Sequence, residues 1–98
     1  MLGPEDCRIA VERTHGGRAT FRETVRVVDT FRGQTAWEGD VHVFDLAGNP
    51  RATEAYAWPE GKRIIAVLKT SPVDGPLAAV RGYVVAEAKR REIEKFGR

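Results

Sequence analysis

The stretch WEGDVHVFDLAGNPRATEAYAW, residues 37–58, alternates apolar and polar side chains on both sides of a turn at AGNP. Such alternation predicts two antiparallel strands, each with one face toward a core. The same stretch carries the large aromatic residues Trp37, Phe44, Tyr56 and Trp58. A slip of one residue would turn every side chain to the other face, so the strand register decides which aromatics a partner could reach.

Length and composition indicate one domain over residues 1–98. The chain is 42% apolar and 31% charged, which is the balance of an ordinary globular protein, and 98 residues are too few for two cores. Its apolar runs fall well short of the roughly 20 residues that cross a bilayer, so no membrane contact is expected. A single cysteine, Cys7, excludes an intramolecular disulfide. Together with the absence of a signal-like N-terminus, this favours a cytoplasmic location.

Glycine-containing turns divide the first two thirds of the chain into antiparallel hairpins. These turns are HGG at 15–17, RGQ at 32–34, AGNP at 47–50 and PEG at 59–61. A three-residue loop at RGQ places Val25 opposite Val41 on an apolar face and Arg26 opposite Asp40 on a polar face. A two-residue loop would put Val27 against Asp40, so the three-residue loop is favoured.

The last strand, RIIAVLK at 63–69, is apolar on both faces, as expected for a strand that is covered on both sides. A three-residue loop at PEG would place Ala57 opposite Arg63 and Ala55 opposite Ile65. Only one helix is firmly predicted, so one face of this strand needs another cover.

SPVDGP at 71–76 opens that helix, which begins at Ser71 or Asp74 and reaches Lys95. We expect the helix to lie over Trp37, which would cover Gly39, and over the small residues Ala55 and Ala57. Its apolar stripe consists of Leu77, Val80, Val84 and Ala88. The sheet positions expected beneath it are Val25, Val27, Val41, Val43, Ile65 and Val67.

Residues 4–14 fit either a capped helix or an extra strand, and the strand is slightly favoured. The predicted fold is therefore α+β, an antiparallel β-meander of four to five strands with one long C-terminal helix packed on one face. In outline this resembles double-stranded RNA-binding domains. That family opens its last helix with paired lysines, whereas this chain has SPVDGP, so the likeness covers topology alone.

The favoured register turns an aromatic and apolar patch away from the helix, and soluble monomers rarely leave such a patch bare. We therefore expect a small non-catalytic module that binds another protein or itself, with a homodimer as the first expectation. The alternative parity at AGNP would turn Tyr56 and Trp58 inward. The predicted partner-binding residues are Phe44, Tyr56, Trp58, Ile64, Leu68, His42, Arg22 and Arg26.

Two other functions use the same face. A single-stranded RNA or DNA platform would stack bases on Phe44, Tyr56 and Trp58 and bind phosphates through arginines, but the net charge is only +2 and the basic residues are dispersed. A small enzyme would need acid and base groups that converge, for which His42 with Glu54 is the best pair. The residue spacing predicts no metal site and no cofactor.

Overall fold

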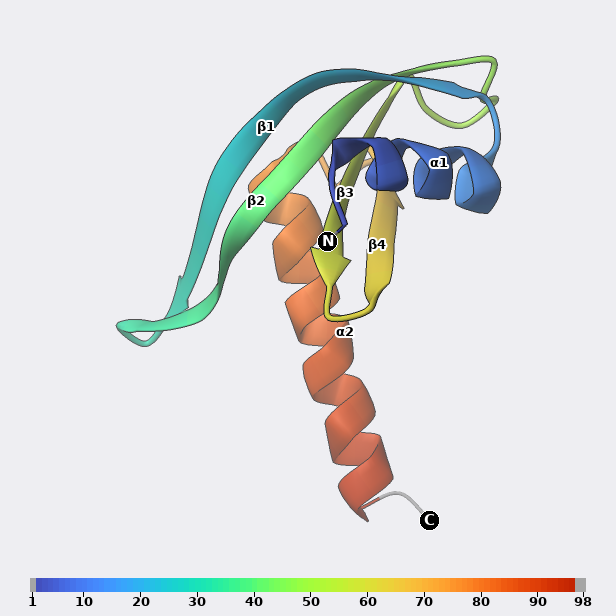
Figure 1. Cartoon of the computed structure of the whole chain (residues 1–98). Helices are drawn as coiled ribbons and strands as arrows, with labels where there is room; N and C mark the ends of the chain where they lie inside the picture. The colour runs from blue at the N-terminus through green and yellow to red at the C-terminus, as the bar shows by residue number, and fades with distance from the viewer. Residues whose placement is uncertain (1, 97–98) are drawn as a thin grey trace.

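The computed structural model describes residues 2–96 and shows a four-stranded antiparallel sheet with a helix on each side (Figure 1). Strand order in the sheet is β1-β2-β3-β4, so neighbours in sequence are neighbours in space. This confirms the predicted α+β class and the antiparallel meander with a long C-terminal helix. The elements are α1 (Pro4–His15), β1 (Arg18–Phe31), β2 (Gln34–Ala47), β3 (Glu54–Glu60), β4 (Arg63–Leu68) and α2 (Pro76–Phe96).

The segment that was slightly favoured as an extra strand is the helix α1, so that prediction was wrong. Pro4 lies in the first turn, where its missing N–H has no helical partner to lose. The backbone N–H of Gly3 donates to the Asp6 carboxylate at 2.9 Å. One turn further on, Arg8 pairs with Glu12 at 3.0 Å. Contacts between side chains four residues apart stabilise a helix and cannot form in a strand.

The hairpin of β1 and β2 keeps the predicted pairing through its centre, with Val25 opposite Val41. The turn is shorter than predicted, because Arg32 and Gly33 form a two-residue connection with φ of 53° and 77°. Positive φ at both positions is typical of the tightest hairpin turns. Ala36 has no partner on β1, and this irregularity restores the register that the shorter loop would have shifted.

The predicted pairing of β3 with β4 was wrong. Ala57 lies opposite Ala66 and not opposite Arg63, because the turn consists of Gly61 and Lys62. Gly61 has a φ of 64°, which glycine adopts without strain. The pairing is displaced by an odd number of residues, so β3 is turned over relative to β4 and each of its side chains lies on the face opposite to the one predicted.

Each face of the sheet carries its own hydrophobic cluster. Under α1 the buried residues are Cys7, Val11, Ala19, Phe44, Leu46, Ala55, Ala57 and Leu68. Under α2 they are Val27, Val41, Val43, Tyr56, Trp58, Ala79 and Val80. The two-sided apolar pattern of residues 63–69 is therefore satisfied within the chain, because a helix covers each face of the sheet.

The face under α2 contains most of the residues that were predicted for it. Trp37, Ile65 and Val67 pack against the cluster there. A Cβ added to Gly39 would lie 2.8 Å from Cη2 of Trp37, so the indole covers this glycine as predicted. Ala55 and Ala57 were the wrong residues for this face, since they lie under α1.

α2 begins at Pro76, later than the predicted start at Ser71 or Asp74. Val80 is fully buried and Val84 packs against the core, but Leu77 is 38% exposed and Ala88 is exposed as well. The predicted stripe was therefore right at its centre and wrong at its ends. Within residues 2–96, neither helix is long and apolar enough to cross a membrane.

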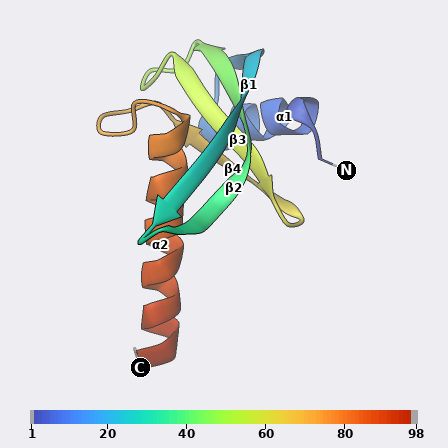
Figure 2. The ribbon, with the colours of Figure 1, turned by 90° about the vertical axis from the view of Figure 1, so that its left-hand side faces the viewer.

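The part of the sheet that has α1 on one face and α2 on the other is called the sandwiched body. Two parts of the molecule project from it, namely the tip of the β1–β2 hairpin and the second half of α2 (Figures 1 and 2). β2 pairs with β3 only from His42 to Asp45, so the first half of β2 runs on without β3 beside it. The radius of gyration, 14.0 Å, is larger than the roughly 13 Å of a compact domain of this length. The hairpin approaches α2 before its turn, where Asp29 of β1 pairs with Arg81 of α2 at 3.0 Å, and the turn itself stands away from the helix (Figure 1).

Candidate interaction surface

The aromatic residues of the predicted partner-binding patch are core residues. Phe44, Tyr56 and Trp58 are each 0% exposed, and Leu68 is 5% exposed. Ile64 is half-buried against the cluster under α1. The prediction that this patch faces outward was wrong. Phe44, Ile64 and Leu68 lie under α1. The reversed parity of β3 places Tyr56 and Trp58 under α2.

Tyr56 and Trp58 follow the alternative parity that turns both residues inward. Trp58 makes edge contacts with Trp37 and with Tyr83 of α2, with ring centroids 5.8 Å apart in both cases. The Tyr56 hydroxyl donates to the Glu54 carboxylate at 2.6 Å. Burial and this hydrogen bond raise the pKa of Tyr56 well above its usual value. The inward aromatics therefore form the centre of the α2-side cluster.

The predicted arginines of the patch are held by carboxylates of neighbouring strands. Arg22 pairs with Asp45 at 2.9 Å and with Glu54 at 2.7 Å. The second predicted arginine, Arg26, pairs with Glu38 at 2.9 Å and Asp40 at 3.2 Å. Acids thus compensate both guanidinium groups, and the aromatics that would have stacked on bases are buried. These two features weaken the nucleic-acid platform.

His42 and Glu54, the best acid and base pair in the sequence, do not converge. β2 and β3 are paired so that His42 faces Ala57 and Glu54 faces Asp45. The two positions are an odd number of residues apart along the ladder, so their side chains lie on opposite faces of the sheet. The arrangement provides no shared site for proton transfer between them.

Each of these two groups has its own local partners. Nδ1 of His42 lies 2.8 Å from Oγ1 of Thr24, and burial lowers the pKa of His42 although the Asp40 carboxylate opposes the shift. Burial also acts to raise the pKa of Glu54, but the hydrogen bonds from Tyr56 and Arg22 outweigh it and the net shift is downward.

The remaining reactive side chain, Cys7, is buried under α1. Burial, with a contribution from the Asp6 carboxylate, raises the pKa of its thiol to about 11, so the thiol is protonated at neutral pH and is a poor nucleophile. Among residues 2–92, whose side chains the structure describes, no three His, Cys, Asp or Glu side chains are grouped closely enough to hold a metal ion.

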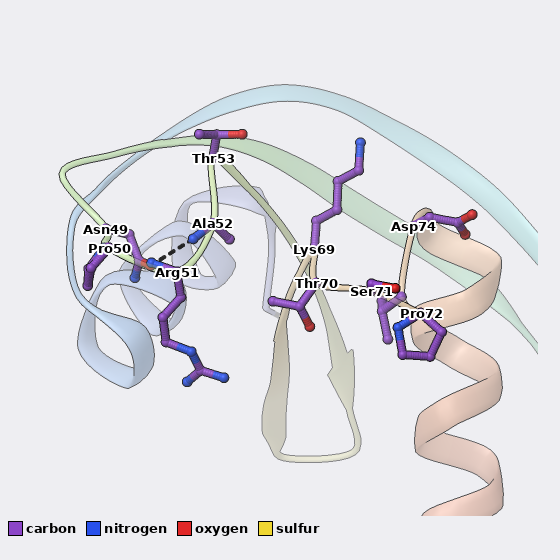
Figure 3. A pocket seen from close by; sticks show the side chains of 11 residues that line it. Asn49, Pro50, Arg51, Ala52, Thr53, Lys69, Thr70, Ser71, Pro72 and Asp74 are labelled. Carbon is purple, nitrogen blue, oxygen red and sulfur yellow. Dashed lines mark hydrogen bonds between the residues drawn. The ribbon is translucent and has the colours of Figure 1, made fainter.

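One cleft lies between the β2–β3 loop and the β4–α2 connection and has a volume of about 800 Å³ (Figure 3). The side chain of Asn49 organises its floor, accepting hydrogen bonds from the backbone N–H groups of Arg51 and Ala52 at 2.7 and 3.1 Å. The side chains of Arg51 and Lys69, its two cations, point away from each other (Figure 3). They do not converge on one anion, and the cleft is an open surface between loops.

A second cleft separates the tip of the β1–β2 hairpin from the middle of α2, and we call it the hairpin–helix groove. Its volume is about 440 Å³. Three apolar side chains line it on the helix side and two on the hairpin side, together with the Asp29–Arg81 ion pair. The lining residues are Asp29, Thr30, Phe31, Ala36, Arg81, Val84, Val85 and Ala88.

The rim of the hairpin–helix groove is apolar and exposed. Phe31 is 65% exposed and Val85 is 52% exposed, the two largest values among the exposed bulky apolar side chains that the structure describes. The guanidinium of Arg32 lies 5.1 Å from the centre of the Phe31 ring. Such a combination of aromatic side chain, aliphatic side chain and arginine is typical of the centre of a protein interface.

The sequence contained a weak signal for this surface. Phe31 directly precedes the RG turn, and an apolar residue at a hairpin tip has little of its own chain to pack against. Val85 lies one position outside the stripe of Leu77, Val80, Val84 and Ala88. Neither signal shows by itself that the hairpin tip and the middle of α2 lie side by side.

Comparison with known proteins leaves the function to be argued from this geometry, because no protein-family model matches the chain and neither the curated proteins nor the solved structures provide a significant match.

Proposed function

We propose that the chain is a small non-catalytic interaction module that associates with a second copy of itself through the hairpin–helix groove. The observation that carries this proposal is the exposure of Phe31 and Val85 on the two sides of an apolar groove. Removing such side chains from water stabilises an association by about 25 cal/mol per Å² of apolar surface.

A second copy is the occupant that the groove favours, because its two sides are complementary to each other. The end of the hairpin supplies the exposed Phe31 ring, and the helix beside it supplies an exposed apolar face at Val85 and Ala88. In a dimer with two-fold symmetry, the same patch of both copies meets. A partner of another sequence would have to bring the same pair of features.

The module needs no cofactor and no metal for this role. A cytoplasmic location is part of the proposal, and the support for it is the single cysteine, whose free thiol is buried. Single-stranded nucleic acid is the weaker alternative partner. The arginines that would meet phosphates are already paired with acids, and releasing them would cost part of the binding energy.

A matched pair of substitutions tests the surface. Val85→Ser removes an apolar side chain from the groove, and Val28→Ser removes the same side chain, which is 48% exposed, from the other face of the hairpin. We expect sedimentation equilibrium to show a wild-type dimer at micromolar concentration and at least a roughly tenfold weaker dimer for Val85→Ser, which corresponds to about 1.4 kcal/mol.

Val28→Ser should leave the dimer unchanged. Circular dichroism of both variants checks that each is folded before its mass is interpreted. A wild-type chain that remains a monomer at high micromolar concentration would remove the proposal, as would equal effects of the two substitutions.

A further inference from the structure

We infer that the element of the second copy that occupies the hairpin–helix groove is its α2, laid antiparallel against α2 of the first. This inference rests on the proposed self-association and adds the contacting element and its direction. Three features support it, namely a stripe of side chains on α2, the charges within that stripe and the position of the groove.

α2 presents a continuous stripe of exposed residues beside its core-facing side. Successive members are four, four, three and four positions apart, a spacing that keeps them on one side of a helix and that is common in paired helices. The buried Val80 and the half-buried Tyr83 lie outside the stripe. Its members are Leu77, Arg81, Val85, Ala88 and Glu92.

The charges in this stripe favour one direction of pairing. In an antiparallel pair, Arg81 meets Glu92 of the partner subunit at both ends, and Val85 meets Ala88 of the partner subunit in the centre. In a parallel pair, arginine would meet arginine and glutamate would meet glutamate. Like charges at facing positions destabilise a pair by about as much as opposite charges stabilise it.

Arg81 is already held in a suitable position within its own chain. Its Nε donates to Oδ1 of Asp29 at 3.0 Å, and the Asp29 side chain is only 8% exposed, whereas the Arg81 side chain is 59% exposed. The planar guanidinium keeps further donors for a second carboxylate. Because one hydrogen bond already orients it, less side-chain entropy is lost when it meets Glu92 of the partner subunit.

The groove fits the same arrangement. Its helix side is lined by Arg81, Val84, Val85 and Ala88, so a helix on the stripe would also lie against Phe31 on the hairpin side. The second half of α2 extends past the sheet, away from the other described strands and α1 (Figure 1). A partner helix can therefore follow the stripe as far as Glu92 without meeting the body of the first copy.

Charge reversal at one end of the stripe is the first test. Glu92→Arg places arginine against Arg81 of the partner subunit at both symmetric contacts, and we expect the dimer dissociation constant to rise by at least tenfold, as roughly estimated from the strength of exposed ion pairs. Glu23→Arg is the matched control, because it makes the same change in net charge at an exposed position on β1 outside the groove. The change in net charge affects both variants equally. Apart from that effect, Glu23→Arg should keep the dissociation constant within about twofold of the wild-type value.

The direction of pairing is measured by distances between nitroxide labels on Lys89→Cys and, in a separate sample, on Ala78→Cys. Native Cys7 is buried and does not compete for the label. With a rise of about 1.5 Å per residue, the antiparallel arrangement gives a short distance of below about 20 Å at position 89 and a longer one, by roughly 15 to 20 Å, at position 78.

The outcomes separate the two levels of the proposal. A dimer that is weakened by Glu92→Arg and has the shorter distance at position 89 supports the inference. A dimer with equal distances at the two positions, or one that is insensitive to Glu92→Arg, overturns helix pairing and leaves self-association standing. A monomer overturns both.

Discussion

β3 and β4 have a helix against each face, whereas the tip of the β1–β2 hairpin and the second half of α2 each have one packed side and one open side. The first region buries its aromatic residues completely, and the second leaves Phe31 and Val85 in the open. An apolar residue in the sandwiched body is therefore explained by the chain's own helices. The packing of the projecting regions buries Phe31 and Val85 only partly. The apolar surface that stays exposed there is the reason to expect a partner.

The largest effect should come from a core aromatic of the sandwiched body. Phe44→Ala leaves a cavity beneath α1, and we expect it to cost about 3 to 5 kcal/mol of the free energy of unfolding, measured by urea titration. Phe31→Ala on the projecting tip should change that free energy by less than about 0.5 kcal/mol when both are measured at concentrations that favour the monomer. If the two substitutions cost the same, the distinction between the regions is lost.

A smaller effect is expected where the projecting half of β2 leaves the body. Gly39→Ala would place its Cβ 2.8 Å from Cη2 and 3.2 Å from Cζ2 of Trp37, so the indole must move. We expect a loss of about 1 to 3 kcal/mol, with a change in tryptophan fluorescence. Gly82→Ala on α2 is the control with the opposite sign. No atom lies within 4 Å of the added Cβ, and the helix should gain about 0.5 to 1 kcal/mol.

The smallest effect should be a dependence of stability on pH that comes from His42. Burial lowers the pKa of His42 in the folded state, so the unfolded chain binds the proton more readily as the pH falls through about 6.5. The contribution of the neutral imidazole is complete above that pH and decreases below it, until the pH passes the folded-state pKa.

The free energy of unfolding, measured by urea titration from about pH 7 to about pH 5, should therefore fall more steeply for the wild type than for His42→Gln. The control is Thr14→Ser at an exposed position, which should have the same dependence of the free energy of unfolding on pH as the wild type. Parallel pH profiles of wild type and His42→Gln would show that this histidine is not desolvated in the folded chain.

Much of the fold was predictable from local patterns. The pairing at the centre of the β1–β2 hairpin follows from the match of apolar with apolar and charge with opposite charge, as Arg26 with Asp40 shows. The requirement that both faces of residues 63–69 be covered was also correct, but α1 supplies the second cover. A short segment with Pro4 and acids in its first turn is ambiguous in isolation, and its helical state is fixed by burying Cys7 and Val11 against the sheet.

The candidate surface was predicted on the wrong face because parity depends on turns. A displacement of the pairing by an odd number of residues exchanges the two faces of a strand, and local sequence alone does not decide between loops of two and three residues or where such a loop begins. At Gly61 this error moved Tyr56 and Trp58 from outside to inside. Phe31 was not selected, since its exposure depends on how far the hairpin extends beyond β3.

By itself, the sequence determined the α+β class, the antiparallel meander, the C-terminal helix and the set of apolar residues available for burial. Each of these follows from interactions between residues close in the chain or from a periodicity that one strand or helix carries alone. The tertiary structure decided which helix covers which face, which aromatics are buried, and that the end of β1 lines a groove with the middle of α2. Those outcomes depend on contacts between segments far apart in sequence, where small differences in loop length select among packings of similar local energy.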